Sequence, residues 1–141
     1  MQRLFVCLIA SLLSGTVLAD VSMLDSGGRV TLSSAGVSVT IDKSKARIIE
    51  LVQNGQSVLA PGQTGYFTLI AGEGDKRDTT LTIENCVFRK HIETVDTIDL
   101  CFTPERSGNF PFDVEIHYVM RSGEPGFYFY LVAAKDGDTR G

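Results

Sequence analysis

The run IHYVMRSGEPGFYFYLVAAK, residues 116–135, decides the fold of this chain. Two apolar, aromatic-rich segments flank the turn sequence SGEPG, a pattern typical of a β-hairpin. The second segment, residues 126–134, carries apolar side chains at successive positions and therefore on both faces. Such a strand belongs in the middle of a sheet that is covered on both sides. We therefore expect residues 126–134 to form a covered central strand.

Upstream of this hairpin, most of the chain alternates polar and apolar residues with a period of two. Val37, Val39 and Ile41, for example, would share one face of a strand. Asn54-Gly55 is the clearest two-residue hairpin signal, because both central positions of a type I′ turn need a positive φ. The alternating runs are residues 29–34, 36–42, 46–53, 57–60, 65–71, 80–88, 97–103 and 112–120.

No window of this sequence shows a helical stripe, and the length of 141 residues suggests a single domain. Eight or nine short strands separated by turns predict an all-β protein, with antiparallel sheets stacked as a β-sandwich. A sandwich of this size could barely supply two layers, so nothing is left to cover the second face of residues 126–134. We therefore expect the sandwich to be incomplete, with the chain truncated at Gly141.

Residues 1–19 have the layout of a secretory signal peptide. Arg3 precedes an apolar run from Leu4 to Leu13, and small or apolar residues stand before Asp20, where a signal peptidase would cut. The alternative is a membrane anchor, but the apolar run is about ten residues long and a spanning helix needs about 20. We expect the domain over residues 20–141 to be secreted or periplasmic, without membrane contact after cleavage.

The chain is acidic, with a formal net charge of −4. Cleavage would remove one basic residue and no acidic one, so the mature charge would be −5. No basic stripe is present, which argues against nucleic acid as a partner. The net negative charge is compatible with an anionic sugar polymer as a partner. Surface charges farther apart than about 8 Å are largely screened, so a local Arg or Lys cluster can still bind a carboxylate.

Cys86 and Cys101 are the cysteines that remain after cleavage, since Cys7 leaves with the signal peptide. An even pair in an oxidising compartment suggests a disulfide. A hairpin that turns at Glu93-Thr94 would place Cys86 and Cys101 directly opposite each other. The alternative is a pair of buried thiols that face the core.

The sequence contains none of the motifs of serine hydrolases, zinc proteases, phosphate-binding loops or dithiol redox proteins. A metal site is not predicted, because His91 and His117 have no ligand spacing with the cysteines. His117 has the chemistry of a general base, but a structural role across the sheet is preferred, and His91 is expected to be solvated. Three acidic pairs are interpreted as solvated edges rather than catalytic carboxylates. They are Asp96 with Asp99, Asp113 with Glu115, and Asp136 with Asp138.

Aromatic residues cluster in the hairpin of residues 116–135. Exposed tyrosines there would make a stacking platform for sugar rings, whereas buried ones would be core, which is the commoner outcome. The sequence leaves both alternatives open. The residues are Tyr118, Phe127, Tyr128, Phe129 and Tyr130.

Four runs together resemble a known family. VTLSSAGVSVTIDK (30–43), ARIIELVQNGQSVL (46–59) and GYF (65–67) are followed by the hairpin IHYVMRSGEPGFYFY (116–130). This order resembles the N-terminal part of the rhamnogalacturonan lyases, polysaccharide lyase family 4. Their hairpin has a histidine-tyrosine step, a basic residue, two glycines and then aromatics. The match covers nearly all of the mature chain. It rests on the order and spacing of the four runs, since no single motif is unique to the family.

The resemblance implies a galactose-mutarotase-like supersandwich, the catalytic domain of a secreted pectin-degrading enzyme. Family members cleave the rhamnose–galacturonate backbone of rhamnogalacturonan I by β-elimination. That reaction needs a neutralised carboxylate and a base within reach of the adjacent proton. The family's catalytic lysine and histidine fall later than the aromatic hairpin, so no catalytic residue is assigned. Lys135 and Arg140 have no matching motif, and His117 matches only the structural histidine-tyrosine step.

The sequence is compatible with three functions. The first is an N-terminal fragment of a secreted rhamnogalacturonan lyase, inactive alone, whose partner is rhamnogalacturonan I. The second is a non-catalytic carbohydrate-binding sandwich that uses Tyr128 and Tyr130, or Tyr66, as its sugar platform. The third is an exported structural or interaction module without a sugar ligand. We expect a monomer without a cofactor, and any calcium would belong to the full-length protein.

Overall fold

A computed structural model describes residues 20–65, 67–72, 79–106 and 110–135 of the chain. These residues form eleven strands and no helix, so the predicted all-β class is confirmed. No helix long and apolar enough to cross a membrane occurs among them. The expectations for residues 1–19, Tyr66 and residues 136–141 lie outside the described residues. The strands are β1 (Ser22–Ser26), β2 (Arg29–Ser34), β3 (Val37–Asp42), β4 (Arg47–Gln53), β5 (Gln56–Ser57), β6 (Leu69–Ala71), β7 (Thr79–Leu81), β8 (Val87–Glu93), β9 (Thr97–Thr103), β10 (Phe112–Arg121) and β11 (Phe127–Lys135).

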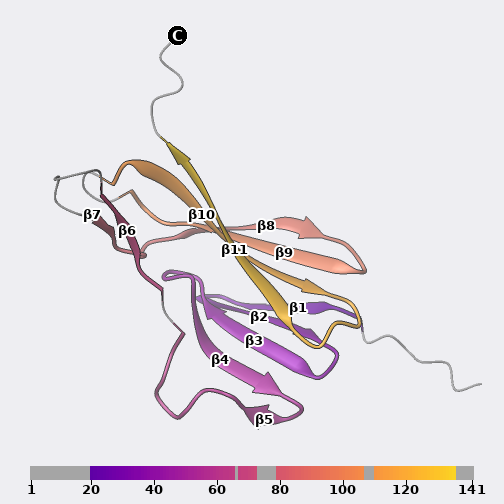
Figure 1. The fold of residues 1–141 in the computed structure, drawn as a ribbon. Helices are drawn as coiled ribbons and strands as arrows, with labels where there is room; N and C mark the ends of the chain where they lie inside the picture. Colours follow the sequence, from indigo (N-terminus) through magenta and orange to yellow (C-terminus); the bar gives the residue numbers. More distant parts are fainter. Residues whose placement is uncertain (1–19, 66, 73–78, 107–109, 136–141) are drawn as a thin grey trace, which may run out of the picture.

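Two antiparallel sheets form the layers of the molecule (Figure 1). One sheet has the order β1-β2-β3-β4-β5 and the other β11-β10-β9-β8, while a short β6-β7 pair lies at one end. Alternate side chains of both sheets point into one shared core, because successive residues of a strand face opposite sides. The predicted antiparallel sandwich is therefore confirmed, and the finer supersandwich assignment stays a prediction.

The core between the sheets is built from aliphatic and aromatic side chains with almost no exposed surface. Their removal from water is the main favourable term in folding. Two hydrogen bonds also join the sheets: the Tyr118 hydroxyl donates to the Ala46 carbonyl (2.7 Å), and the Ser34 hydroxyl to the Arg121 carbonyl (3.1 Å). The largest fully buried side chains of the core are those of Val30, Leu32, Val39, Ile41, Leu100, Phe102, Ile116, Tyr118 and Met120.

Two asparagines set strand boundaries through a positive φ. Asn54 and Gly55 have φ values of 50° and 77° and join β4 to β5, so the predicted hairpin turn is confirmed. Asn85 has a φ of 49°, a left-handed conformation that asparagine tolerates better than most residues. The expected strand over residues 80–88 is therefore interrupted, and its two ends belong to β7 and β8.

The expectation that residues 126–134 form a covered central strand is wrong for the described part of the chain. β11 is an edge strand that pairs only with β10, and its side chains are exposed on both faces. The tight turn after Arg121 places β11 beside β10, whose other side is already paired with β9. Turn geometry, not apolar composition, therefore sets the place of β11.

The predicted disulfide is also not formed, because Cys86 and Cys101 are both free thiols. The β8–β9 register places Arg89, not Cys86, opposite Cys101. Cys86 packs against the core between the sheets, whereas Cys101 alternates with the core residues Leu100 and Phe102 and so faces the other way. Burial raises the pKa of Cys86 to about 11, so this thiol stays protonated at neutral pH.

The β3–β4 turn is organised by the carboxylate of Asp42. Its Oδ1 accepts hydrogen bonds from the Ser44 amide (2.9 Å), the Ser44 hydroxyl (2.7 Å) and the Lys45 amide (3.2 Å). Desolvation by itself would raise the pKa of Asp42, but these hydrogen bonds and the charge of Arg47 outweigh it, so the pKa is lowered below 3.8.

This lowered pKa makes Asp42 a source of acid sensitivity. A carboxyl whose folded pKa lies below its unfolded value stabilises the fold above the unfolded pKa, and that stabilisation is lost as the pH falls through the folded pKa. We therefore expect Asp42→Asn to flatten the loss of stability below about pH 4. Urea unfolding midpoints of both proteins over this range measure it, and parallel pH profiles would contradict the assignment.

Candidate functional site

The face of the β8–β11 sheet that points away from the core, here called the outer face, carries a polar cluster. The cluster consists of Asp99, Cys101, Glu115, His117 and Tyr130. Alternation along β9 and β10 places the first four on this face, because the intervening residues fill the core. The register brings His117 opposite Cys101 on one side and opposite Tyr130 on the other.

His117 lies at the centre of this cluster, with a carboxylate at each ring nitrogen. Its Nδ1 donates to Asp99 Oδ1 at 2.9 Å, and its Nε2 lies 3.4 Å from Glu115 Oε2. The Tyr130 hydroxyl reaches across β10 and donates to the second oxygen of Asp99 at 2.9 Å. Asp99 and His117 are each only 2% exposed, so this pair is buried although it lies outside the core.

Strand β8 adds Arg89 and His91 beside the cluster. The Arg89 guanidinium donates to Glu115 Oε1 at 2.5 Å and to His91 Nδ1 at 3.0 Å. The His91 ring meets the His117 ring edge-on, with 5.3 Å between centroids. The register of β8 shifts between Lys90 and Ile92, so His91 lies at the irregularity. His91 is exposed, as expected, but it has specific partners.

The hydrogen bonds of this cluster control its protonation. Desolvation alone would raise the pKa of Glu115, but the hydrogen bonds from Arg89 and His117 outweigh it and lower that pKa. Burial and the bond to Asp99 raise the pKa of Tyr130 to about 12. Burial, with the nearby Glu115 charge, also raises the pKa of the Cys101 thiol. At neutral pH the cluster therefore holds an ionised Glu115, a neutral phenol and a neutral thiol.

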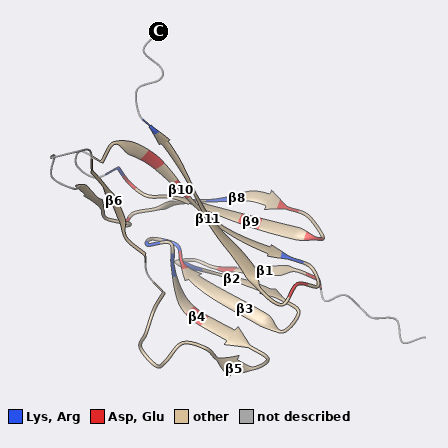
Figure 2. Cartoon of the chain, viewed as in Figure 1, with Lys and Arg blue, Asp and Glu red and all other residues tan. Residues whose placement is uncertain are grey.

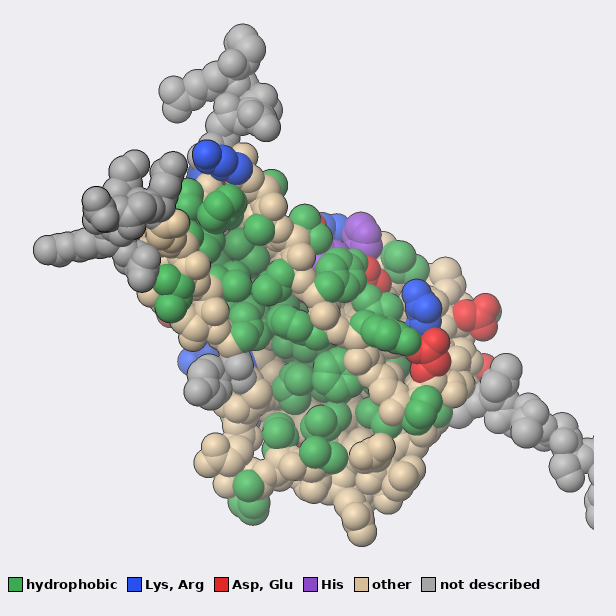
Figure 3. Space-filling model, viewed as in Figure 1, with side chains coloured by type: hydrophobic (Ala, Val, Ile, Leu, Met, Phe, Trp, Pro, Cys, Tyr) green, Lys and Arg blue, Asp and Glu red, His purple; other side chains and the backbone are tan. Residues whose placement is uncertain are grey.

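Two tyrosines form the exposed edge of the outer face. Tyr130 stacks on the ring of His117 with 4.4 Å between centroids and 11° between planes. Tyr128, two residues earlier, lies under the Arg121 guanidinium at 5.4 Å and donates a hydrogen bond to Glu124. In the view of Figure 3, hydrophobic side chains form a band along β11.

The five aromatic residues of the hairpin thus divide between the two alternatives that the sequence left open. Tyr118 is buried in the core, and Phe127 and Phe129 alternate onto the same inner face. Tyr128 and Tyr130 are 51% and 39% exposed.

Charged residues are interspersed over the described chain without a basic stripe (Figure 2).

Sequence reasoning missed the cluster because it compared residues only by their spacing along the chain. Asp99 was expected at a solvated edge but is buried against His117. Ligand-type atoms of Cys101, Glu115 and His117 lie within 4.8 Å of one another, although β9 and β10 are separate strands. One signal was available: Asp99 and His117 both lie inside strongly apolar runs, where an unpaired charge would be costly.

This arrangement can act in two ways. The exposed tyrosine rings can stack on flat apolar faces such as those of sugars. The His117 ring, held beside Glu115 and Cys101, can offer a nitrogen to a cation. Comparison of the chain with protein-family models, with curated proteins and with solved structures finds no match.

Proposed function

We propose that this chain binds the acidic pectic polysaccharide rhamnogalacturonan I on the outer face of its four-stranded sheet. Within this proposal the chain is the N-terminal part of the catalytic sandwich of a secreted rhamnogalacturonan lyase. The observation that carries it is the pair Tyr128 and Tyr130, exposed on one face of β11. Positions two apart along a strand are separated by about 7 Å. The two rings therefore form a row suited to successive sugars of one chain.

Two arginines favour an acidic polymer over a neutral one. The Arg121 guanidinium lies over the Tyr128 ring, and Arg89 lies beside the part of the cluster that Tyr130 covers. A guanidinium can grip a carboxylate with two parallel hydrogen bonds. Arg89 already forms an ion pair with Glu115. Arg121 is therefore the stronger candidate to bind a galacturonate carboxylate.

Catalysis is assigned to segments outside this chain. A base for β-elimination must reach the proton beside the uronate carboxylate. His117 does not fit that role, because it is 2% exposed and both of its ring nitrogens face carboxylates. The proposal therefore includes no catalytic residue, and the chain alone is expected to release no unsaturated uronate product from rhamnogalacturonan I. Product formation, followed by ultraviolet absorbance, would contradict this part of the proposal.

Binding is tested by isothermal titration of the exported chain with rhamnogalacturonan I, polygalacturonate and a neutral glucan. We expect heat of binding with the acidic polymers and none with the glucan. Tyr128→Ala and Tyr130→Ala should each weaken binding about fivefold or more, since a stacking contact is worth about 1 kcal/mol. The matched control is Leu131→Ala, which removes an exposed apolar side chain from the opposite face of β11.

Two outcomes would overturn this proposal, and a third would replace its lyase part. A folded chain that binds none of the polymers would favour the third function, an interaction module without a sugar ligand. Binding that survives both tyrosine substitutions but is lost in Leu131→Ala would move the sugar site to the inner face of β11. Binding by a chain whose natural coding frame ends at Gly141 would favour the alternative of a free-standing carbohydrate-binding module.

A further inference from the structure

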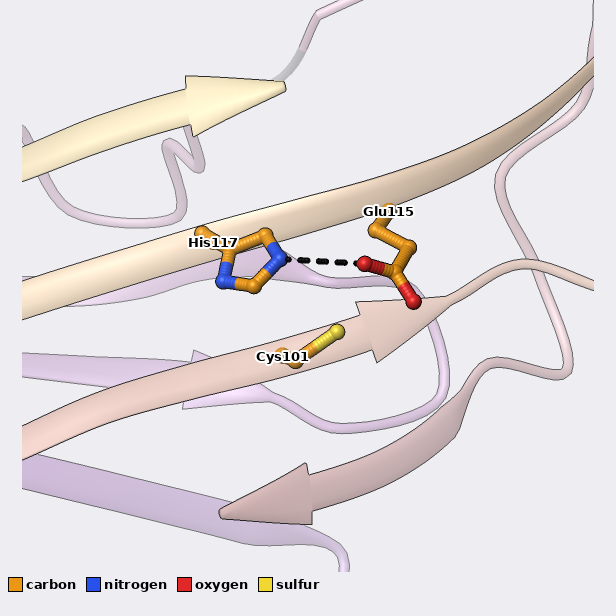
Figure 4. A group of neighbouring side chains, drawn as sticks. All are labelled: Cys101, Glu115 and His117. Atoms are coloured by element: carbon orange, nitrogen blue, oxygen red, sulfur yellow. Dashed lines mark hydrogen bonds and ion pairs between the residues drawn. The ribbon is translucent and has the colours of Figure 1, made fainter. Parts of the chain in front are cut away.

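We propose that Cys101, Glu115 and His117 bind one zinc ion on the outer face of the four-stranded sheet. Their donor atoms lie within 4.8 Å of one another, and the cysteine and histidine side chains are fully buried. Figure 4 shows the Cys101 sulfur and the Glu115 carboxylate converging on the same side of the His117 ring. This inference is independent of the proposed sugar binding.

His117 is held in the orientation that a metal ligand needs. Its Nδ1 donates to Asp99, and this bond directs Nε2 towards Glu115 and Cys101. Histidines that bind zinc usually donate their other ring N–H to a carboxylate or carbonyl, which sets the tautomer and the ring orientation. Asp99 itself accepts a hydrogen bond from the Tyr130 hydroxyl, so the carboxylate that orients His117 is also fixed in position.

The separations between the donor atoms fit a tetrahedral ion. Two ligands about 2.1 Å from zinc at the tetrahedral angle lie about 3.4 Å apart. The observed separation between His117 Nε2 and Glu115 Oε2 is 3.4 Å. A sulfur ligand belongs about 3.6 Å from each of these atoms. The donor atoms lie within 4.8 Å of one another, which exceeds this separation by about 1.2 Å at most, so a small shift of the Cys101 side chain would complete the group.

The charges also balance when zinc is bound. A thiolate, a carboxylate and a neutral imidazole together carry two negative charges, which neutralise Zn²⁺. Binding would release the Cys101 thiol proton to the solvent. Arg89 bonds Glu115 through Oε1, which leaves Oε2 for the metal.

The donor set selects the kind of ion. Sulfur and imidazole ligands suit zinc, whereas calcium and magnesium take oxygen ligands. Three protein ligands would leave the fourth position of the ion to water, which is typical of catalytic rather than structural zinc sites. Glu115 is half-exposed at this position, so the open side of the ion would face the solvent.

The test uses the exported chain, purified in a phosphine reductant and freed of metal with a chelator. Zinc affinity is measured by competition with a chromophoric chelator, and cobalt(II) is used as a spectroscopic probe. We expect one zinc per chain and, with cobalt, the intense visible bands of a tetrahedral site together with a thiolate charge-transfer band. Excess calcium should not compete.

Substitutions identify the ligands. Cys101→Ser should abolish the thiolate band, whereas Cys86→Ser, which changes the other free cysteine, should keep it. Asp99→Asn should weaken zinc binding about 10–100-fold without removing the thiolate band, as expected for a positioning residue. Glu115→Gln, at a half-exposed position, tests the site even if the cysteine variant fails to fold, and should weaken zinc binding more than Asp99→Asn.

Three results would overturn the proposal. The first is a folded, reduced chain that binds no zinc in the chelator competition. The second is a thiolate band that survives in Cys101→Ser but disappears in Cys86→Ser. The third is zinc affinity that stays unchanged in both Glu115→Gln and Asp99→Asn.

Discussion

Replacing His117 with alanine is expected to lower the free energy of unfolding by about 3–5 kcal/mol. The substitution leaves the Asp99 carboxylate buried. Of its two hydrogen-bond partners in the cluster, His117 is then lost and the Tyr130 hydroxyl remains. Removing one partner of such a buried pair costs more than the pair contributes, because the group that remains stays out of water without its partner. Urea unfolding followed by far-UV circular dichroism measures the change, with a chelator present so that metal binding does not contribute.

A double substitution provides the control for this prediction. If the cost arises from the uncompensated charge, Asp99→Asn combined with His117→Ala should be more stable than His117→Ala alone. A double-mutant cycle over Asp99 and His117 then gives the coupling between the two side chains. A loss of less than about 1 kcal/mol in His117→Ala would mean that the pair is solvated and that the cluster is not a buried site.

Phe102→Ala is expected to cost about 3–5 kcal/mol through a cavity between the two sheets. Phe102 has no exposed surface, and its ring packs against Phe88 and Tyr118 with centroid distances of 5.2 Å and 5.8 Å. The cost combines the lost transfer of the ring from water with the contacts that its neighbours lose. Urea unfolding of the variant measures it.

The matched control for the core is Val95→Ala, which shortens a side chain that is 79% exposed in the β8–β9 turn. Surface changes of this kind usually stay within about 0.5 kcal/mol. If Phe102→Ala were as mild as Val95→Ala, the two sheets would not share the core described above.

The features of this fold that could be predicted from the sequence are those that depend on residues close together in the chain. The alternation of Val37, Val39 and Ile41 predicted a strand with one buried face, and β3 has those three residues in the core. Asn54-Gly55 predicted a two-residue hairpin because asparagine and glycine accept a positive φ more readily than other residues. Both inferences depend on residues that are close in sequence, so no knowledge of neighbouring strands was needed.

The sequence by itself therefore determined the all-β class, the buried faces of the main strands and the sharpest turn. The tertiary structure alone decided that β11 lies at an edge, that Cys86 and Cys101 face opposite sides, and that His117 meets Asp99, Glu115 and Cys101. The physical reason is that periodicity defines faces within one strand but not which strands are neighbours or in what register. A register shift of one residue moves every side chain to the opposite face, so a site built across β9, β10 and β11 exists only once those strands are paired.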